Sequence, residues 1–113
     1  MATEVFSGDG LRRKQVGVLN RGKIFKGQGL SKEHIGDYKE GRIYGDEGGI
    51  FKKPVGEYEE GDVFSGHGLK RKKIGSYKSG DIFEGIGLGK KKTGSYKGDD
   101  EGAAAAAFLL LLK

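Results

Sequence analysis

The chain contains no cysteine and no tryptophan, and Pro54 is its only proline. Without cysteine, neither a disulfide nor a thiolate metal site can form. A single proline excludes collagen and polyproline segments. Apolar residues make up only 35% of the 113 residues, which is little for a deep core. We therefore expect one domain that buries its apolar groups in a shallow layer.

The first residues, Met1 to Glu4, lack the basic start and the apolar run of a secretory signal. Together with the missing cysteines, this favours an intracellular, reducing compartment. Association with a membrane is kept open as part of the same prediction.

Glycine is abundant, with 23 residues against a usual share of about 7%. The glycines mark five copies of a segment that begins with an aliphatic and an aromatic residue, at 5–11, 24–30, 43–50, 63–69 and 82–88. A basic stretch and then an aliphatic-Gly-x-aromatic box follow each copy, and the boxes are 16–19, 35–38, 55–58, 74–77 and 93–96. Such a period is typical of a repeat protein.

Each repeat is expected to form one β-hairpin. A glycine every few residues disfavours a helix, by about 1 kcal/mol each against alanine. Segments 20–23, 39–42, 59–62 and 78–81 each place a glycine where a tight hairpin turn needs a positive φ angle. The sequence predicts an all-β fold, a meander of about ten short antiparallel strands in an open, twisted, single-layer sheet. Gly48, Gly49 and Pro54 indicate a bulge in the third unit.

The aromatic residues recur at two fixed positions of the repeat. Alternation along a strand places the glycines beside them, and a glycine leaves room for a neighbouring ring. We expect an aromatic packing ladder formed by Phe6, Phe25, Tyr44, Phe64, Phe83, Tyr38, Tyr58, Tyr77 and Tyr96.

Residues 75–88 resemble a MORN repeat, whose core reads Gly-x-aromatic-x-x-Gly, followed by a spacer and Gly-x-Gly. The same order occurs at 36–41 and 56–68, and the likeness covers roughly residues 5–98. The present repeat is shorter than the family's, and its spacer is one residue longer. The resemblance implies an open sheet of hairpins. It also implies scaffolding, protein docking or attachment to phospholipid, without chemistry of its own.

Positive charge is concentrated in the connection inside each hairpin. These connections would all project from one sheet edge and form a basic rim, made of Arg12, Arg13, Lys14, Lys52, Lys53, Lys70, Arg71, Lys72, Lys73, Lys90, Lys91 and Lys92. Such a rim suits lipid head groups or an acidic protein face. Nucleic acid is less suited, because no free aromatic platform lies among the basic loops. Alternatively, the charges only keep the turns soluble and protect sheet edges.

The composition changes abruptly at residue 99, where an acidic segment leads into five alanines and an apolar end. Alanine and leucine favour a helix, and acidic residues ahead of it suit its N-terminus. Ten apolar residues are too few to span a bilayer. We expect the tail to cap the last hairpin, to enter a partner or to dip into a membrane through Phe108, Leu109, Leu110, Leu111 and Leu112.

No motif indicates catalysis. The Gly-x-Gly pairs open no helix, and residues 85–90 lack the spacing of a phosphate loop. His34 and His67 lie in different parts of different units and suggest no metal site. We expect no enzyme activity, no cofactor, no metal and no small-molecule substrate.

The sequence thus predicts a hairpin domain over residues 1–98 and an acidic hinge with an apolar helical tail over 99–113. The leading functional hypothesis is a non-catalytic scaffold or docking subunit that binds protein partners in a larger assembly. The alternative is a peripheral membrane module that uses the basic rim and the tail on anionic lipid. A closed ten-strand barrel with a ligand cavity is the third possibility.

Overall fold

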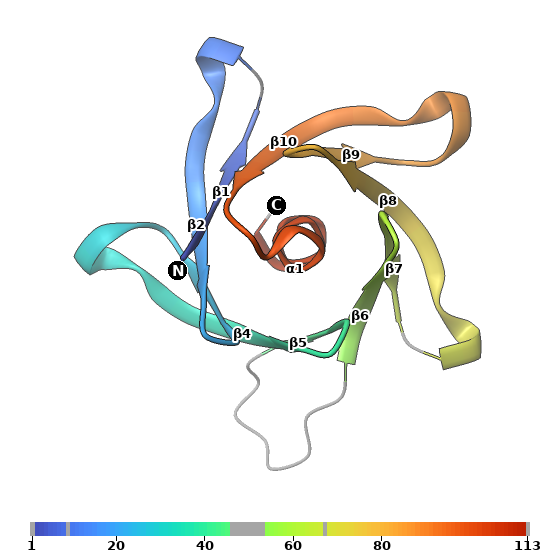
Figure 1. Cartoon of the computed structure of the whole chain (residues 1–113), viewed down its shortest axis with the longest axis horizontal. Helices are drawn as coiled ribbons and strands as arrows, with labels where there is room; N and C mark the ends of the chain where they lie inside the picture. The colour runs from blue at the N-terminus through green and yellow to red at the C-terminus, as the bar shows by residue number, and fades with distance from the viewer. Residues whose placement is uncertain (1, 9, 46–53, 67, 113) are drawn as a thin grey trace.

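The computed structural model describes residues 2–8, 10–45, 54–66 and 68–112, and in it ten antiparallel strands form a ring around a central helix (Figure 1). The strands are β1 (Thr3–Ser7), β2 (Lys14–Asn20), β3 (Lys23–Lys26), β4 (Glu33–Lys39), β5 (Arg42–Gly45), β6 (Pro54–Glu59), β7 (Asp62–Ser65), β8 (Lys72–Lys78), β9 (Asp81–Glu84) and β10 (Lys91–Lys97). Short 3₁₀ turns join four of the hairpins, η1 (Gly10–Arg12), η2 (Gly29–Ser31), η3 (Gly68–Lys70) and η4 (Gly87–Gly89). The chain ends with α1 (Glu101–Ala107) and the π-helical η5 (Phe108–Leu112).

The predicted open sheet is wrong, because the sheet closes into a barrel. The first and last strands pair, with Glu4 opposite Lys97 and Phe6 opposite Ser95. The result is a disc with extents of 40 × 38 × 20 Å rather than a long ribbon. The all-β class, the ten antiparallel strands and the C-terminal helix are as predicted.

A β-bulge repeated in every hairpin explains the closure. In each pairing of an odd strand with the longer strand after it, the register skips the first residue of the box. The skipped residues are Val16, Ile35, Val55, Ile74 and Thr93. A bulge bends its strand and increases its twist, so five bulges at one level curl the sheet until its edges meet. The sequence alone predicts a bulge only in the third unit, where Gly48 and Gly49 lie outside the described residues and Pro54 begins β6.

The tight turns between hairpins agree with the prediction. Arg21 and Gly22 have φ angles of 50° and 82°, and the equivalent pairs in the next three turns also have two positive angles. Two successive positive φ angles are typical of a type I′ turn, whose twist matches that of paired strands.

The barrel interior is filled by the C-terminal tail. Five inward β-branched residues, one for each hairpin, are 0% exposed, and they are Val5, Ile24, Ile43, Val63 and Ile82. Ala103 to Ala107, at 0–2% exposure, belong to the same core. Small alanines let the helix fit inside a ten-stranded wall, since a barrel of about eight strands is already filled by its own side chains.

The end of the tail matches the five-fold wall residue by residue. A Cβ atom added to any of the five box glycines would lie within 3.1 Å of one tail side chain. The pairs are Gly94 with Phe108, Gly75 with Leu109, Gly56 with Leu110, Gly36 with Leu111 and Gly17 with Leu112. Five successive tail residues thus face the five hairpins within one turn around the barrel axis. Such a turn needs more residues than the 3.6 of an α-helix. The wider π-helical winding of η5 supplies them.

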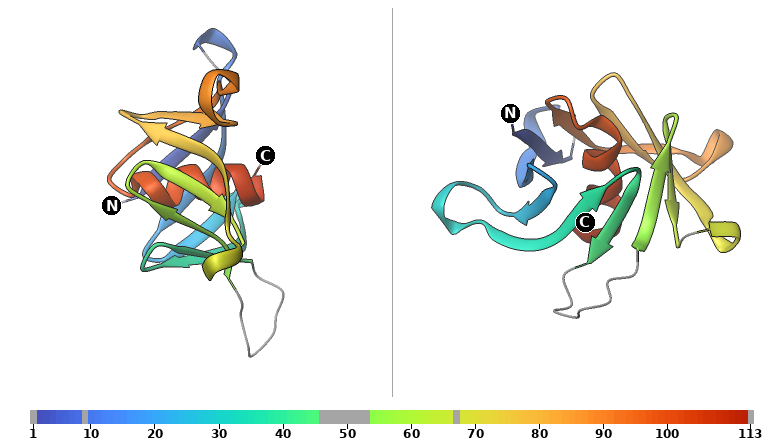
Figure 2. Two further views of the ribbon diagram at one scale, coloured as in Figure 1. Left: turned by 90° about the vertical axis from the view of Figure 1, so that its right-hand side faces the viewer. Right: turned by 60° about the horizontal axis from the view of Figure 1, so that its bottom comes forward.

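The two ends of the barrel differ. All tight turns lie at one end and the 3₁₀ turns at the other, because the strands form a simple meander. The helix enters at the end with the tight turns, where Gly102 lies against Tyr58 and Tyr77. It leaves at the end with the 3₁₀ turns, which flare outward from the ring (Figures 1 and 2).

Candidate functional site

The outer wall carries the same aromatic arrangement in four hairpins. Each phenylalanine ring points away from the core and is covered by the cation seven residues later. The distances from cation to ring centroid are 4.5 Å for Arg13 over Phe6, 4.7 Å for Lys32 over Phe25, 4.0 Å for Arg71 over Phe64 and 5.2 Å for Lys90 over Phe83. Cations within about 6 Å of a ring are attracted to its face. These contacts fold the base of each loop onto the wall.

Four leucines beyond these contacts are fully exposed. They lie one in each 3₁₀ turn and have relative exposures of 106–108%, and we call Leu11, Leu30, Leu69 and Leu88 the leucine crown. In the last unit Ile86 is also 57% exposed. The sequence analysis did not single these residues out. The available signal was a leucine recurring between a glycine pair and a basic stretch, where no strand could bury it.

The predicted basic rim surrounds the crown. Its members in the first, fourth and fifth units lie in or beside η1, η3 and η4, and Lys52 and Lys53 fall outside the described residues. Some of the cations are held by carboxylates on the wall. Lys73 Nζ lies 2.9 Å from Asp62 Oδ1, and the equivalent pair in the next unit is Lys92 with Asp81, at 3.0 Å. The rim thus combines structural ion pairs with exposed cations such as Arg12, Lys70 and Lys91.

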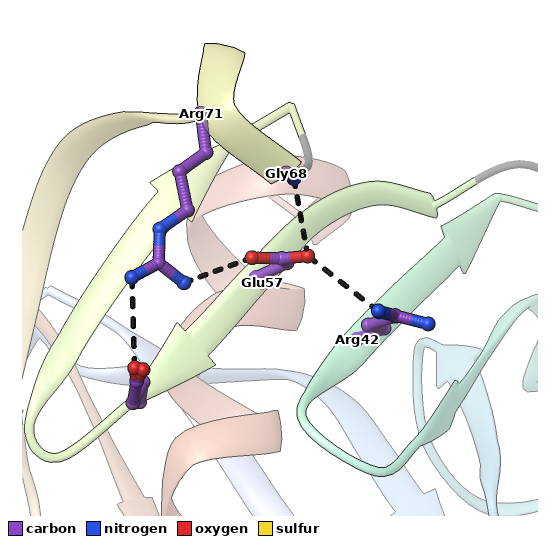
Figure 3. Close-up of polar contacts among 5 residues, drawn as sticks. Arg42, Glu57, Gly68 and Arg71 are labelled. Atoms are coloured by element: carbon purple, nitrogen blue, oxygen red, sulfur yellow. Dashed lines mark hydrogen bonds and ion pairs between the residues drawn. The ribbon is translucent and has the colours of Figure 1, made fainter.

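One rim residue takes part in a polar cluster around a buried carboxylate on the outer wall (Figure 3). Glu57 is 9% exposed, and its carboxylate accepts a 2.9 Å hydrogen bond from Arg71 and a 3.5 Å bond from the Gly68 amide. Arg42 lies 3.5 Å away on the neighbouring strand. The hydrogen bond from Arg71, assisted by the Gly68 amide and the nearby charges, lowers the pKa of Glu57 below its ordinary 4.5. The cluster therefore holds a carboxylate in its charged form.

The aromatic ladder is divided between the two faces of the wall. The tyrosines of the boxes pack against the core around the entering helix, whereas the phenylalanines lie outside. Tyr44 lies opposite Asp37 at the position of a phenylalanine. The two sets therefore do not form one continuous stack.

The apolar tail lies inside the barrel and not on an outer surface. Phe108, Leu109 and Leu112 are buried, and Leu110 and Leu111 are partly buried against the same core. We expected a cap on the last hairpin or an insertion into a partner or membrane. The tail was placed outside because an open sheet has no interior.

Polar contacts fasten the start of the helix to the barrel. The hydroxyl of Tyr38 donates a 2.8 Å hydrogen bond to Asp100, whose own amide donates to Thr3 at 3.1 Å. Burial, together with the hydrogen bond to Asp100, raises the pKa of Tyr38 to about 12. Burial also raises the pKa of Tyr58 and Tyr96.

Within the part of the chain that the structure describes, no three His, Cys, Asp or Glu side chains are grouped so that they could hold a metal ion. None of the described helices combines the length and the apolar character needed to cross a bilayer. His34 lies 2.8 Å from Asp37 and beside the Phe25 ring, and His67 is outside the described residues.

Comparison of the chain with protein-family models, curated proteins and solved structures found no match. The resemblance to MORN repeats stays a prediction.

Proposed function

We propose that this protein is a non-catalytic docking module that binds anionic membrane surfaces through its leucine crown and basic rim. The observation that carries the proposal is the full exposure of a leucine at the same position of four hairpins. The leucines of these four turns add no stability to the barrel, because none of them is buried.

The apolar part of the proposal follows from the position of the crown. The turns radiate from one end of a disc that is 40 × 38 Å across (Figure 2). Transfer of an exposed leucine side chain into an apolar environment yields about 1.5–3 kcal/mol. Four widely spaced leucines can enter the head-group region of one flat bilayer together. The disc would then lie with its axis along the membrane normal.

The electrostatic part follows from the cations beside each leucine. Arg12 follows Leu11, Lys70 follows Leu69, and Lys90 to Lys92 come soon after Leu88. Lys and Arg side chains next to an apolar anchor are the usual combination for anionic lipid. Their attraction falls off within a Debye length, about 10 Å at 0.1 M salt, so binding should weaken with salt.

A lipid surface suits the crown better than a protein surface. Protein interfaces have a continuous apolar centre and are poor in lysine, whereas the crown consists of separate apolar tips among lysines and arginines. Docking of a protein through free sheet ends, an exposed glycine face or an external tail would need an open sheet. In the closed barrel β1 pairs with β10 and the tail covers the box glycines.

The test is flotation with liposomes of phosphatidylcholine alone or mixed with phosphatidylserine, at low and high salt. We expect binding to the mixed liposomes, weaker at high salt, and little binding to phosphatidylcholine. Replacing all four crown leucines by serine should remove at least nine-tenths of the bound fraction.

The matched control removes the same number of positive charges from the opposite end of the barrel. Replacing Lys14, Lys70 and Lys72 by glutamine should reduce binding several-fold. The same change at Lys23, Lys39 and Lys78, near the tight turns, should leave most of it. Equal losses in the two triple variants, or no binding to anionic liposomes, would contradict the proposal. Binding of the crown to a protein instead would favour the scaffold hypothesis.

A further inference from the structure

The repeat creates an equivalent position at the seam between each hairpin and the next. There the third residue of a box lies directly opposite the aromatic residue in the first strand of the following hairpin. The residues at this position are Val18, Asp37, Glu57, Ser76 and Ser95. Each has an aromatic residue on one side, whereas the residue on its other side is Glu4, Lys23, Arg42, Asp62 and Asp81 in turn.

Two of these seams share two of the groups that surround the Glu57 carboxylate and differ in the third. Glu57 is opposite Phe64, and the next loop brings Arg71 and the Gly68 amide to its carboxylate. At the seam between β10 and β1, Ser95 is opposite Phe6, and the equivalent loop residues are Arg13 and Gly10. The arginine and the glycine are therefore both present and the Glu57 carboxylate is missing, whereas Asp81 lies opposite Ser95 where Arg42 lies opposite Glu57.

A pocket occupies the place of the missing carboxylate. It has a volume of about 420 Å³, and Gly8, Gly10, Arg13, Asp81, Lys92 and Ser95 are among its lining residues. The hollow at the equivalent seam, which Glu57 partly fills, measures about 230 Å³. The exchange of glutamate for serine thus coincides with a pocket nearly twice as large.

The polar groups of the pocket are arranged for an anion. Ser95 is 9% exposed, and its buried hydroxyl has no hydrogen-bond partner among the described residues. Unpaired buried polar groups are uncommon in native proteins, and a bound ligand is one explanation for them. Asp81 is paired with Lys92 at 3.0 Å, whereas no carboxylate pairs with Arg13 in the described part of the chain. Counted over the described lining residues alone, the pocket has one more positive charge than negative charges.

We infer that the pocket between β9, β10 and β1 is a binding site for a carboxylate, which takes the place that the Glu57 side chain fills at the equivalent seam. The Arg13 guanidinium and the Gly10 amide donate to its oxygens, as Arg71 and Gly68 do to Glu57. The carboxylate belongs to a small organic acid or to an acidic side chain of a peptide.

The test is an NMR titration of the labelled full-length protein with succinate, and with an end-blocked Gly-Glu-Gly peptide as a second arm. Succinamide and a Gly-Gln-Gly peptide serve as neutral controls. We expect saturable shifts of the Gly8 and Gly10 amides with the acids only. Tighter binding of the peptide would assign the site to a protein side chain, and tighter binding of succinate to a small acid.

Variants at Arg13, Ser95 and Glu57 test whether the pocket and the Glu57 seam bind a carboxylate in the same way. Arg13→Gln should raise the Kd at least tenfold, and Ser95→Glu should abolish the shifts by supplying an internal carboxylate. Lys90→Gln, the matched change at the neighbouring seam, should alter the Kd less than twofold. Glu57→Ser should open a second site, seen as new succinate-dependent shifts at the Gly68 amide.

Two results would overturn the inference. One is the absence of a saturable shift with either acid, and the other is binding that Ser95→Glu leaves unchanged. Ser95→Glu adds a partner for Arg13 and is expected to fold. If the NMR spectrum of this variant keeps the dispersion of the wild type, unfolding does not explain a loss of binding. The titration contains no lipid, so its outcome is independent of the membrane proposal.

Discussion

The inner and outer faces of the barrel wall are built from the same five repeats but differ in how strictly they repeat. Inside, every hairpin presents a valine or isoleucine that is 0% exposed and a glycine that touches the tail. Outside, the third residue of the box differs between hairpins and is Val18, Asp37, Glu57, Ser76 or Ser95. One helix contacts all five hairpins, so the inner face must be uniform. The outer face has no such constraint and holds both candidate binding sites.

The largest expected effect on this comparison comes from removing residues 99–113. The inner face would lose the helix that fills it, and the barrel would enclose a cavity lined by apolar groups and bare glycines. We expect no cooperative thermal transition by circular dichroism. Addition of the missing segment as a peptide should restore one. A truncated chain that melts like the full chain would show that the tail is not the core.

A smaller effect separates a leucine of the tail inside the barrel from a leucine of the crown. Leu109 is 8% exposed and touches Gly75, whereas Leu69 is fully exposed in the crown. Leu109→Ala should reduce the free energy of unfolding by about 2–5 kcal/mol because it leaves a cavity. Leu69→Ala should change it by no more than about 0.5 kcal/mol. Urea denaturation measures both, and similar losses would contradict the assignment of the two faces.

A matched pair of glycines sharpens the comparison further. A Cβ atom at Gly75 would lie 2.4 Å from the Phe83 carbonyl oxygen and 2.5 Å from Leu109, whereas one at Gly89 in η4 meets nothing within 4 Å. Gly75→Ala should cost about 1–3 kcal/mol through overpacking. Gly89→Ala should be neutral or stabilise the protein slightly by restricting the unfolded chain. A tolerated alanine at position 75 would mean that the tail does not approach the wall there.

The smallest expected effect is a pH dependence at the entry of the helix. The pKa of Tyr38 in the folded protein is raised to about 12, against an ordinary 10.0. Its contribution to stability is therefore complete below pH 10 and is lost as the pH rises from 10 through 12. In Tyr38→Phe the free energy of unfolding should fall less steeply over this range. The same slope in both proteins would contradict the contact with Asp100.

The sequence was sufficient for the strands and turns but not for their closure. The period of the glycines and of the aliphatic-aromatic pairs sets ten strands, and Gly22 and its equivalents set the tight turns. Closure depends on bulges at Val16 and its equivalents, which do not differ from ordinary strand residues in composition. The partner of Gly75 could not be found either, because Leu109 is distant in the chain and belongs to a run of four identical residues.

The two candidate sites were predictable to different degrees. The basic rim could be read from runs such as residues 70–73, because their charge recurs in register. The pocket at Ser95 could not, since its meaning depends on a comparison with Glu57 at a seam that exists only once β10 pairs with β1. A serine in one repeat and a glutamate in another are unremarkable until both are known to face an arginine.

The central claim is that the tail threads a closed barrel, with one tail residue for each hairpin. Nuclear Overhauser contacts between the tail side chains and the α-protons of the box glycines test it most directly. We predict contacts of Leu109, Leu110, Leu111 and Leu112 with Gly75, Gly56, Gly36 and Gly17, in that order. Absence of these contacts, or contacts of all four leucines with the last hairpin alone, would contradict the account.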